Sequence, residues 1–326
     1  VQGVRVELYR DDGITPGVFD AGDTYLSFND TDTNGYYRFD DLGAGDYVVI
    51  IPADNFRDVG AGDTNPADPL AGYLSSGTSI AANGTTSDGF GPNPDNDVDD
   101  DDNGITRFAG NAVDYVAAQA VTLGPGGSEP TGETNPTTNP QTGEAVDDQS
   151  NRTVDFGFYR QELGNLVFQD IDEDGAFGGS DGTLDGATVQ LFAADGTTEI
   201  NVGPDGIWGT ADDAPGGMTS VGGGNYRFSG LPSGTYVVKV LPTGYPGTVD
   251  TANPGDTANP NDNVDDNDNG VGTGAGITSS NPVTLTPGSP GALANNVITT
   301  ATGTTYNPTV DFGFVTVFAK TIVATD

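Results

Sequence analysis

The 326-residue chain carries 48 acidic against 10 basic residues, a formal net charge of −38, and it contains 50 Gly, 21 Pro, no Cys and no His. A surface this acidic disfavours nucleic acid and anionic membranes as partners, and no run approaches the roughly 20 apolar residues of a membrane span. The missing Cys excludes disulfides, and without Cys or His most nucleophilic triads and proton shuttles are absent, so we do not expect an enzyme.

A long internal repeat organises the chain, whose length alone predicts two or three domains. The matching stretches are 1–9 with 184–192, 37–39 with 226–228, 94–105 with 260–271, and the run TVDFGF at 153–158 with 309–314. Short alternating apolar runs between Gly, Pro and Asp turns predict all-β, antiparallel sandwiches. We assign one sandwich to 1–159, a second to 160–315, and a further strand to 316–326. The weakly helical stretch 111–123 is expected to be strand, because its equivalent 273–285 contains Gly, Ser and Pro.

Acidic residues gather in two loops of the first repeat. In the earlier loop a cation site and a polar loop are equally good interpretations, and the ligands would be Asp20 and Asp23. The later loop, PDNDVDDDDNGI at 94–105, packs its carboxylates so densely that they repel one another unless cations or solvent screen them. Its Val98 argues against a disordered charge run. We therefore favour calcium there, with the candidate ligands Asp95, Asp97, Asp99 and Asp101.

The most specific motif is the twelve-residue stretch DIDEDGAFGGSD at 170–181. Acids at the first, third, fifth and twelfth positions and Gly at the sixth have the spacing of a calcium loop. The predicted ligands are Asp170, Asp172, Asp174, the carbonyl of Ala176, and Asp181. The twelfth ligand is usually a Glu, and the flanking runs 165–169 and 187–191 alternate like strands. We therefore predict a calcium loop between strands rather than an EF-hand; the alternative is a solvated acidic hairpin.

Two further acidic clusters follow in the second repeat. For the first of these, DGIWGTADD at 205–213, calcium and a polar loop are again equal alternatives, with Asp205, Asp212 and Asp213 as ligands. The second, PNDNVDDNDNGV at 260–271, repeats the dense acidic run of the first repeat, and we favour calcium for it. Its candidate ligands are Asp262, Asp265, Asp266 and Asp268. The sequence thus predicts several calcium ions, with folding coupled to their binding.

Four motifs together resemble the B-repeat domains of serine–aspartate-repeat surface adhesins. They are GNLVFQDIDEDG at 164–175, DGATVQLF at 185–192, NYRFSGLPSGTYVVKV at 225–240 and TVDFGF at 309–314. That family is similar to the collagen-adhesin B-type domains. The resemblance implies calcium-binding, Ig-like or prealbumin-like β-sandwiches with acidic loops, acting as rigid stalks on a bacterial surface. Related B-type domains form Lys–Asn isopeptide bonds, but the first strand, 165–169, has no Lys. Lys239 lies in mid-domain, so only Lys320 remains a candidate.

The two ends of the sequence complement each other. Val1 aligns with Leu184, so the first repeat lacks the strand and calcium loop found at 164–181. TVDFGFVTVFAKTIVATD at 309–326 aligns with TVDFGFYRQELGNLVFQD at 153–170, which places Asp326 at the position of the calcium ligand Asp170. Either the sequence is a window on a longer array, or the strand enters the open repeat of another molecule, giving a head-to-tail filament. A chance alternation remains a third interpretation.

We therefore expect an extracellular structural protein, a calcium-stabilised subunit of a surface fibre or adhesin stalk that self-associates. Weak carboxylate-rich sites suit the high calcium outside cells. The alternative is an adhesin module that binds a carbohydrate or a host protein. In that case exposed aromatic side chains would stack on the ligand, and the candidates are Tyr25, Tyr73, Trp208 and Tyr245.

Overall fold

The computed structural model describes residues 1–60, 63–89, 91–96, 101–124, 151–243, 245, 248–250, 259–261, 266–272, 276–286, 298–299 and 304–316. These residues form β-strands and a single 3-10 turn, η1 (Ala53–Asn55), with no α-helix in the described ranges, which confirms the all-β class. The chain divides into two compact units. Unit 1 comprises Val1–Ser79 and Thr86–Tyr159, and unit 2 comprises Ile80–Thr85 and Arg160–Asp326.

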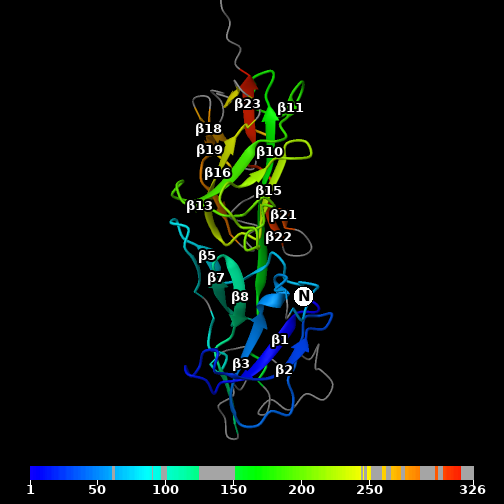
Figure 1. Ribbon diagram of the computed structural model, residues 1–326, viewed down its shortest axis with the longest axis vertical. Coiled ribbons are helices and arrows are strands. Elements are labelled where there is room, and N and C mark those ends of the chain that lie inside the picture. The colour runs from blue at the N-terminus through cyan, green and yellow to red at the C-terminus, as the bar shows by residue number, and fades with distance from the viewer. Residues whose placement is uncertain are drawn as a thin grey trace, which may run out of the picture. The chain divides into compact units, whose positions relative to one another are not determined.

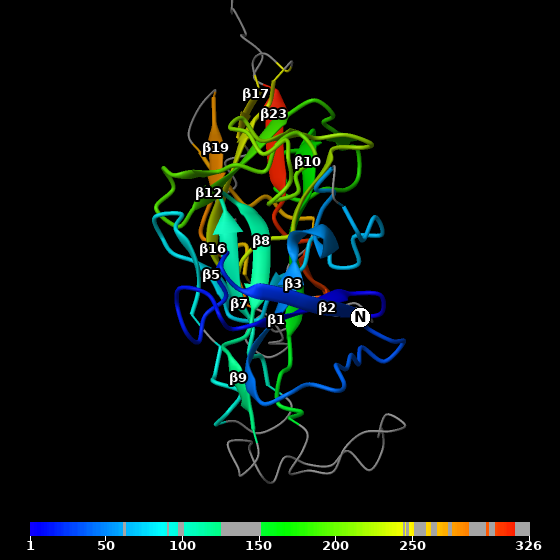
Figure 2. The same ribbon diagram turned by 60° about the horizontal axis from the view of Figure 1, so that its bottom comes forward.

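Unit 1 is built on an antiparallel sheet in the order β2-β1-β3-β8-β7, with β9 also paired to β3 (Figures 1 and 2). The bounds are β1 Arg5–Arg10, β2 Thr24–Asp30, β3 Gly45–Pro52, β7 Ile105–Ala109, β8 Ala112–Ala117 and β9 Val121–Leu123. Three shorter strands are β4 Leu74–Ser75, β5 Thr78–Ile80 and β6 Thr86–Asp88. The stretch 111–123 thus forms strands, as predicted. Central β3 carries the run YVVII, whose side chains are all buried because neighbours cover both faces.

Unit 2 contains two sheets. One has the order β17-β23-β10-β22-β21 with β11 and β15 paired to β10, and the other has the order β13-β12-β16-β19-β18 with β14 and β20 attached. The first comprises β10 Phe158–Gln169, whose first two residues belong to unit 1, together with β11 Gly182–Thr183, β15 Asn225–Ser229, β17 Thr248–Asp250, β21 Ile298–Thr299, β22 Thr304–Asn307 and β23 Phe312–Thr316. The second comprises β12 Thr188–Ala193, β13 Glu199–Ile200, β14 Met218–Thr219, β16 Gly234–Leu241, β18 Gly270–Val271, β19 Thr278–Ser280 and β20 Val283–Leu285. Fully buried residues from both sheets, such as Leu163, Phe228, Leu191 and Val238, form the core expected of a sandwich.

The long strand β10 departs from a purely antiparallel plan. It pairs antiparallel with β15 but parallel with β22 and β23 (Figure 1). The reason is connectivity, because the chain runs through strands of the other sheet, β16 and β18 to β20 among them, before β22 and β23 return beside β10. Such a crossover is the connection that parallel neighbours require.

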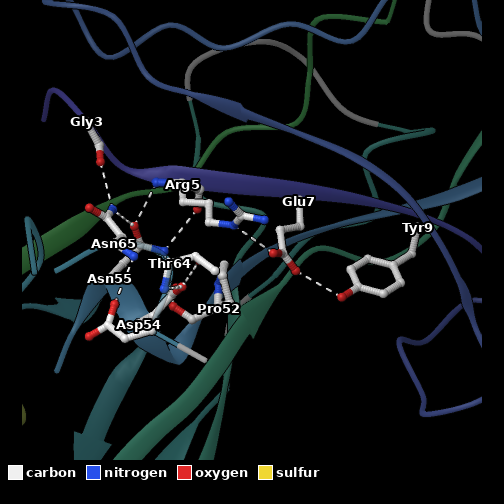
Figure 3. A network of polar contacts seen from close by, with 10 residues as sticks. Gly3, Arg5, Glu7, Tyr9, Pro52, Asp54, Asn55, Thr64 and Asn65 are labelled. Carbon is white, nitrogen blue, oxygen red and sulfur yellow. Dashed lines mark hydrogen bonds and ion pairs between the residues drawn. The ribbon is translucent and has the colours of Figure 1, made fainter. Parts of the chain in front are cut away.

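A polar network in unit 1 fastens the segment after β3 to the start of β1 (Figure 3). Asn55 is fully buried, and its carbonyl accepts the backbone N–H of Arg5 at 2.7 Å while its amide donates to the Arg5 carbonyl at 2.9 Å. The same amide donates to the Pro52 carbonyl, and the Asn65 amide bridges Asn55 to the Gly3 carbonyl. One side chain therefore satisfies both backbone groups of Arg5, which the ladder of β1 leaves unpaired at that point.

Replacing Asn55 with Ala is expected to destabilise unit 1 by about 3 kcal/mol, because each buried polar group left without a partner costs roughly 1–3 kcal/mol. Differential scanning calorimetry of the whole chain would measure this as a lower Tm. The matched control is Asn34→Ala, at an exposed position. Equal Tm values for the two variants would contradict the assigned role of Asn55.

Candidate metal centre

The loop 170–181 leaves the end of β10 and returns through β11. Phe168 and Gln169 pair with Thr183 and Gly182, so the loop connects two antiparallel strands. This confirms the prediction of a loop between strands rather than between helices. The end of β10 is fixed on its other side too, because the Asp170 N–H donates to the Phe314 carbonyl at 3.0 Å. The first predicted ligand is therefore held by the sheet itself.

Four of the five predicted ligands converge in this loop. One carboxylate oxygen from each of Asp170, Asp172, Asp174 and Asp181 lies within 4.8 Å of all the others. Within the described part of the chain, no other three acids meet in this way. Calcium–oxygen bonds of about 2.3–2.6 Å place ligand oxygens up to about 5 Å apart across the ion. The spacing of these carboxylates would therefore let all four reach one metal ion.

Asp170 shapes the loop as well as facing the cluster. It is buried, its Oδ1 accepts the N–H of Glu173 at 2.7 Å, and its Oδ2 accepts the N–H of Gly175 at 2.9 Å. Glu173 and Gly175 both have positive φ, +60° and +79°. Glycine adopts that conformation without strain, so Gly175 allows the sharp turn that the motif requires. Asp170 therefore holds the turn through hydrogen bonds to its backbone.

Asp181 closes the loop at its other end. Its Oδ1 accepts the N–H of Ile171 at 2.7 Å and its Oδ2 accepts that of Gly178 at 2.9 Å. Ala176 lies between these points and donates its N–H to Asp174 Oδ1. Its carbonyl as a fifth ligand stays a prediction.

The cluster carries an electrostatic cost in the absence of a cation. Removal from water is the largest influence on Asp172 and raises its pKa, and the charges of Asp174, Asp181 and Asp170 raise it further. Each of these effects disfavours the ionised carboxylate. A divalent cation would reverse them, because it is attracted by the same four charges that repel one another.

The structure brings part of the later acidic run beside this loop. The Phe177 N–H donates to the Asp266 carbonyl at 2.6 Å, and the Asp268 N–H donates to the Gly175 carbonyl at 2.9 Å. The carboxylate of Asp268 is fully buried, and its Oδ1 accepts the N–H groups of Gly270 and Gly313. Asp266 and Asp268 thus support the loop through their backbones, while Asp262 and Asp265 lie outside the described residues.

The remaining predicted ligands make contacts within their own loops. Asp205, Asp212 and Asp213 surround the hydroxyl of Thr210, which lies 2.8 Å from Asp212 Oδ1. Asp20 accepts the N–H groups of Ile14, Thr15 and Gly22, and these bonds, led by that from Gly22, lower its pKa. Asp23 accepts those of Gly13 and Asp20. These bonds are what a polar loop needs, and calcium at either cluster stays a prediction.

In the acidic run of unit 1, only the edges fall within the described residues. Asp95 accepts the Thr122 N–H at 2.9 Å, and Asp101 lies 3.4 Å from the Asn103 amide. Asp97, Asp99 and Asp326 lie outside the described residues. The buried residue at this end is Asp102, the repeat equivalent of Asp268, and burial raises its pKa.

The sequence analysis missed two sets of buried hydrogen bonds, those of Asp311 and those between an Asn and an Asp in each unit. In unit 2, Asp311 is fully buried, and its Oδ1 accepts the Leu166 N–H on β10 while its Oδ2 accepts the Asp266 N–H. Asn269 exchanges two hydrogen bonds with the Asp311 backbone, and Asn103 does the same with Asp155 in unit 1. The signal was present in the sequence, since an acid inside the apolar run TVDFGF and an Asn-Gly pair both recur in the two repeats.

The aromatic residues proposed for sugar stacking differ in how exposed their side chains are. Trp208 is 4% exposed, so its assignment as an exposed platform is wrong: its ring is covered by the core of unit 2. Tyr245 donates its hydroxyl to the Asp185 carbonyl, and Tyr73 is half-buried. Tyr25 is 45% exposed and stays a candidate. Lys239 donates to the Gly196 carbonyl and lies over the Phe192 ring.

Comparison with known proteins gives two partial relatives. No protein-family model matches the chain. Two serine-aspartate repeat-containing proteins F of Staphylococcus epidermidis are each 33% identical to it over 113 residues, which is 34% of this chain. The match spans only 6% of each relative's length. It confirms the resemblance to serine–aspartate-repeat proteins that the motifs indicated, over that share of the chain, and neither relative bears an enzyme name.

One solved structure aligns along the whole chain. It is a minor pilin of Streptococcus agalactiae, with 13% identity, coverage of 100% of this chain and 87% of the pilin, and a TM-score of 0.27. A TM-score this low does not bear on fold or function. Among the described residues there is also no helix long and apolar enough to cross a membrane.

Changing Asp172 to Asn is expected to have opposite effects with and without calcium. In chelator the variant should have a higher Tm than the parent chain, because one of the mutually repelling carboxylates is removed. Adding calcium should raise the Tm of the variant much less than that of the parent chain, because the variant lacks one of the predicted ligands. Thermal unfolding of both proteins in both buffers measures this, with Asp114→Asn, an exposed acid outside the cluster, as control. A variant that is less stable in chelator would contradict the assigned repulsion.

The raised pKa of Asp172 makes the stability of the folded chain depend on pH. Because the folded chain binds this proton more tightly than the unfolded chain, acidification through that pKa stabilises the metal-free protein, and this contribution is lost as pH rises. Protons also compete with calcium for the carboxylate. The Tm difference between calcium and chelator should therefore shrink as pH falls, starting above the pH at which an ordinary Asp titrates. A constant difference down to that pH would contradict this expectation.

Proposed function

We propose that this chain is an extracellular structural protein, a calcium-stabilised subunit of a surface fibre or adhesin stalk made of tandem β-sandwiches. The observation that carries the proposal is the convergence of Asp170, Asp172, Asp174 and Asp181 at the end of β10. A cation bound there would tie β10, β11 and the segment at 266–268 together, since all three meet at this loop. Calcium would then set the stiffness of unit 2.

The surroundings of the loop support a calcium-rich location outside the cell. The ligands are exposed or half-exposed except for Asp170, and the twelfth position holds Asp instead of the longer Glu. Extracellular calcium sites of this weak kind have dissociation constants of about 0.1–1 mM. The acidic excess of the chain and the resemblance to serine–aspartate-repeat proteins agree with a cell-surface role.

Assembly is the finer part of the proposal. The chain would associate with copies of itself head to tail, by giving a β-strand from one copy to an open sandwich in the next. Such a contact joins two different surfaces of the same molecule, so it does not close on itself and produces a filament.

Chelation is expected to lower the Tm of the chain and to increase cleavage in unit 2 by a protease. At calcium concentrations 100 times the dissociation constant, binding to the folded state alone stabilises it by about 2.7 kcal/mol per site. Calorimetric scans with calcium and with excess chelator measure the shift, and limited proteolysis locates it. Magnesium at equal concentration is the ionic control, and an unchanged Tm in excess chelator contradicts calcium stabilisation.

A ligand-binding role remains as a second candidate, because one strand exposes apolar side chains. On β2, Tyr25, Leu26 and Phe28 are 45%, 41% and 48% exposed. Exposed aromatic rings of this kind stack on sugars or bind host proteins. A glycan array probed with the parent chain and with Tyr25→Ala would decide: binding that requires Tyr25 supports this second role.

A further inference from the structure

The strand β2 forms one edge of the sheet in unit 1, on the outer side of β1 (Figure 1). It is seven residues long, and in the described part of the chain no strand pairs with its outer side. Every residue of β2 is exposed except Asn29, which is half-buried. A long open edge of this kind is a template for another β-strand, and most proteins interrupt or cover such edges.

The register of β2 identifies the backbone groups that face outward. The N–H of Thr31, one residue beyond β2, donates to the Val4 carbonyl at 2.9 Å, so Thr31 faces β1. The backbone groups of successive residues in a strand point to opposite sides, and the register with β1 is unbroken from Asp30 to Ser27. Asp30 and Phe28 therefore direct their N–H and C=O groups away from β1.

The side chains along this edge are apolar and ordered. Tyr25, Leu26 and Phe28 are the large apolar side chains that β2 exposes. The Tyr25 ring contacts the Tyr9 ring edge-on, with centroids 5.4 Å apart, and the Arg5 guanidinium lies 3.8 Å from the centroid of the Phe28 ring. Rings that are fixed before binding lose little conformational entropy when a partner covers them. The edge therefore offers preorganised apolar contacts beside its free backbone groups.

The equivalent edge of unit 2 is closed. Thr31 and Ser220 align the two edges, because their hydroxyls accept a backbone N–H and donate to a backbone carbonyl at matching positions. Unit 2 has only β13 and β14 there, of two residues each, separated by 201–217. Gly217 stands at the position of Phe28, has a φ of +67°, and leaves no room for a Cβ. β10 and β11 take no part in closing this edge, because they belong to the other sheet of unit 2.

Both ends of β2 are acidic. The Asp residues that flank or end the strand are Asp11, Asp12, Asp20 and Asp23 on one side and Asp30 and Asp32 on the other. In the described part of the chain, none of these carboxylates is in an ion pair. Two copies of β2 paired antiparallel would bring the Thr24 end of each, with its acids, beside Asp30 of the other. Like charges across a strand pair are destabilising, so the charge favours a basic partner over a second copy.

We propose that β2 binds an extended segment of another protein, which adds to the sheet as a further strand. The segment would be apolar at its centre, where it meets Leu26 and Phe28, and would carry Lys or Arg at both ends, beside the flanking acids. Hydrogen bonds to the backbone of Phe28 and Asp30 would hold the segment, and its side chains would determine which segments bind. Because opposite charges would draw the partner in, added salt would weaken the association.

This inference rests on the ligand-binding role given above as the second candidate, and it names the ligand as a polypeptide. The probe is a fluorescent peptide as long as β2, seven residues, in which Val and Thr alternate and both ends are Lys. One control peptide has Glu at both ends. A second keeps the Lys ends but has its internal amides methylated, so that it cannot donate hydrogen bonds to a sheet edge. Anisotropy titrations with the whole chain measure the three dissociation constants.

Four variants separate the backbone, the ring and the charge. Phe28→Pro removes the ring and an N–H that faces away from β1, a loss that an edge strand tolerates, whereas Phe28→Ala removes the ring alone. Asp30→Lys reverses the charge at one end of β2. Asp114→Lys makes the same change at an exposed position on β8. Circular dichroism of each variant establishes that it is folded.

The Lys-ended peptide is expected to bind the parent chain several-fold more tightly than either control peptide. Phe28→Pro should weaken its binding several-fold more than Phe28→Ala, because a backbone hydrogen bond is lost as well. Asp30→Lys should weaken it more than Asp114→Lys. Equal binding of the methylated peptide would overturn the proposal, and so would no binding of the Lys-ended peptide up to about 1 mM. Equal affinities of Phe28→Pro and Phe28→Ala would overturn the pairing through the backbone.

Other occupants of the edge give different outcomes. If sedimentation velocity finds a dimer of the parent chain but not of Phe28→Pro, a foreign segment is overturned as the occupant, since β2 then pairs with a second copy. Sugar binding that requires Tyr25, without any peptide binding, contradicts strand addition and leaves the ligand-binding role in place. Peptide binding together with a Tm unaffected by chelator supports strand addition and contradicts only the calcium-stabilised stalk.

Discussion

The placement of one strand, β10, between β15 and the TVDFGF segment determines the rest of unit 2. The strand hydrogen-bonds to neighbours on both sides and buries Tyr226, Phe228, Phe312 and Phe314 almost completely. In the described part of unit 1 the equivalent segments, Tyr36–Asp40 and Thr153–Gly157, form no strand. They still share the hydrogen bond from the Tyr37 hydroxyl to the Val154 carbonyl and the bonds between Asn103 and Asp155, which match those of unit 2. These side-chain and loop contacts therefore recur in both units.

The acidic loop at 170–181 is a consequence of where β10 ends. Its first acid, Asp170, is bonded to the sheet through its N–H and to the turn through its carboxylate. That turn brings the other carboxylates near Asp170, and the repulsion among them contributes to the raised pKa of Asp172. Strand order and ion binding are therefore linked: an ion at this loop would stabilise the end of β10, and a displaced β10 would disperse the ligands.

Local pattern in the sequence was enough for the strand-rich fold and for the loop at 170–181, because both depend on residues close together in the chain. It was not enough for contacts between distant residues. Asp311 reaches Leu166 across 145 positions, and nothing near either residue indicates the pairing. Trp208 was expected to be exposed, but it is buried in the core of unit 2. The parallel pairing of β10 was missed for the same reason, since it arises from a crossover through the other sheet.

The most direct test of this account is hydrogen exchange, measured by mass spectrometry on the chain with calcium and with excess chelator. With calcium, the amides of residues 168–183 should exchange slowly, because an ion held by the four carboxylates would fix the end of β10 and β11. With chelator the same amides should exchange faster, while those of β3 in unit 1 should keep their rates. Equal exchange of residues 168–183 in the two buffers would contradict the claim that an ion at this loop stabilises the end of β10.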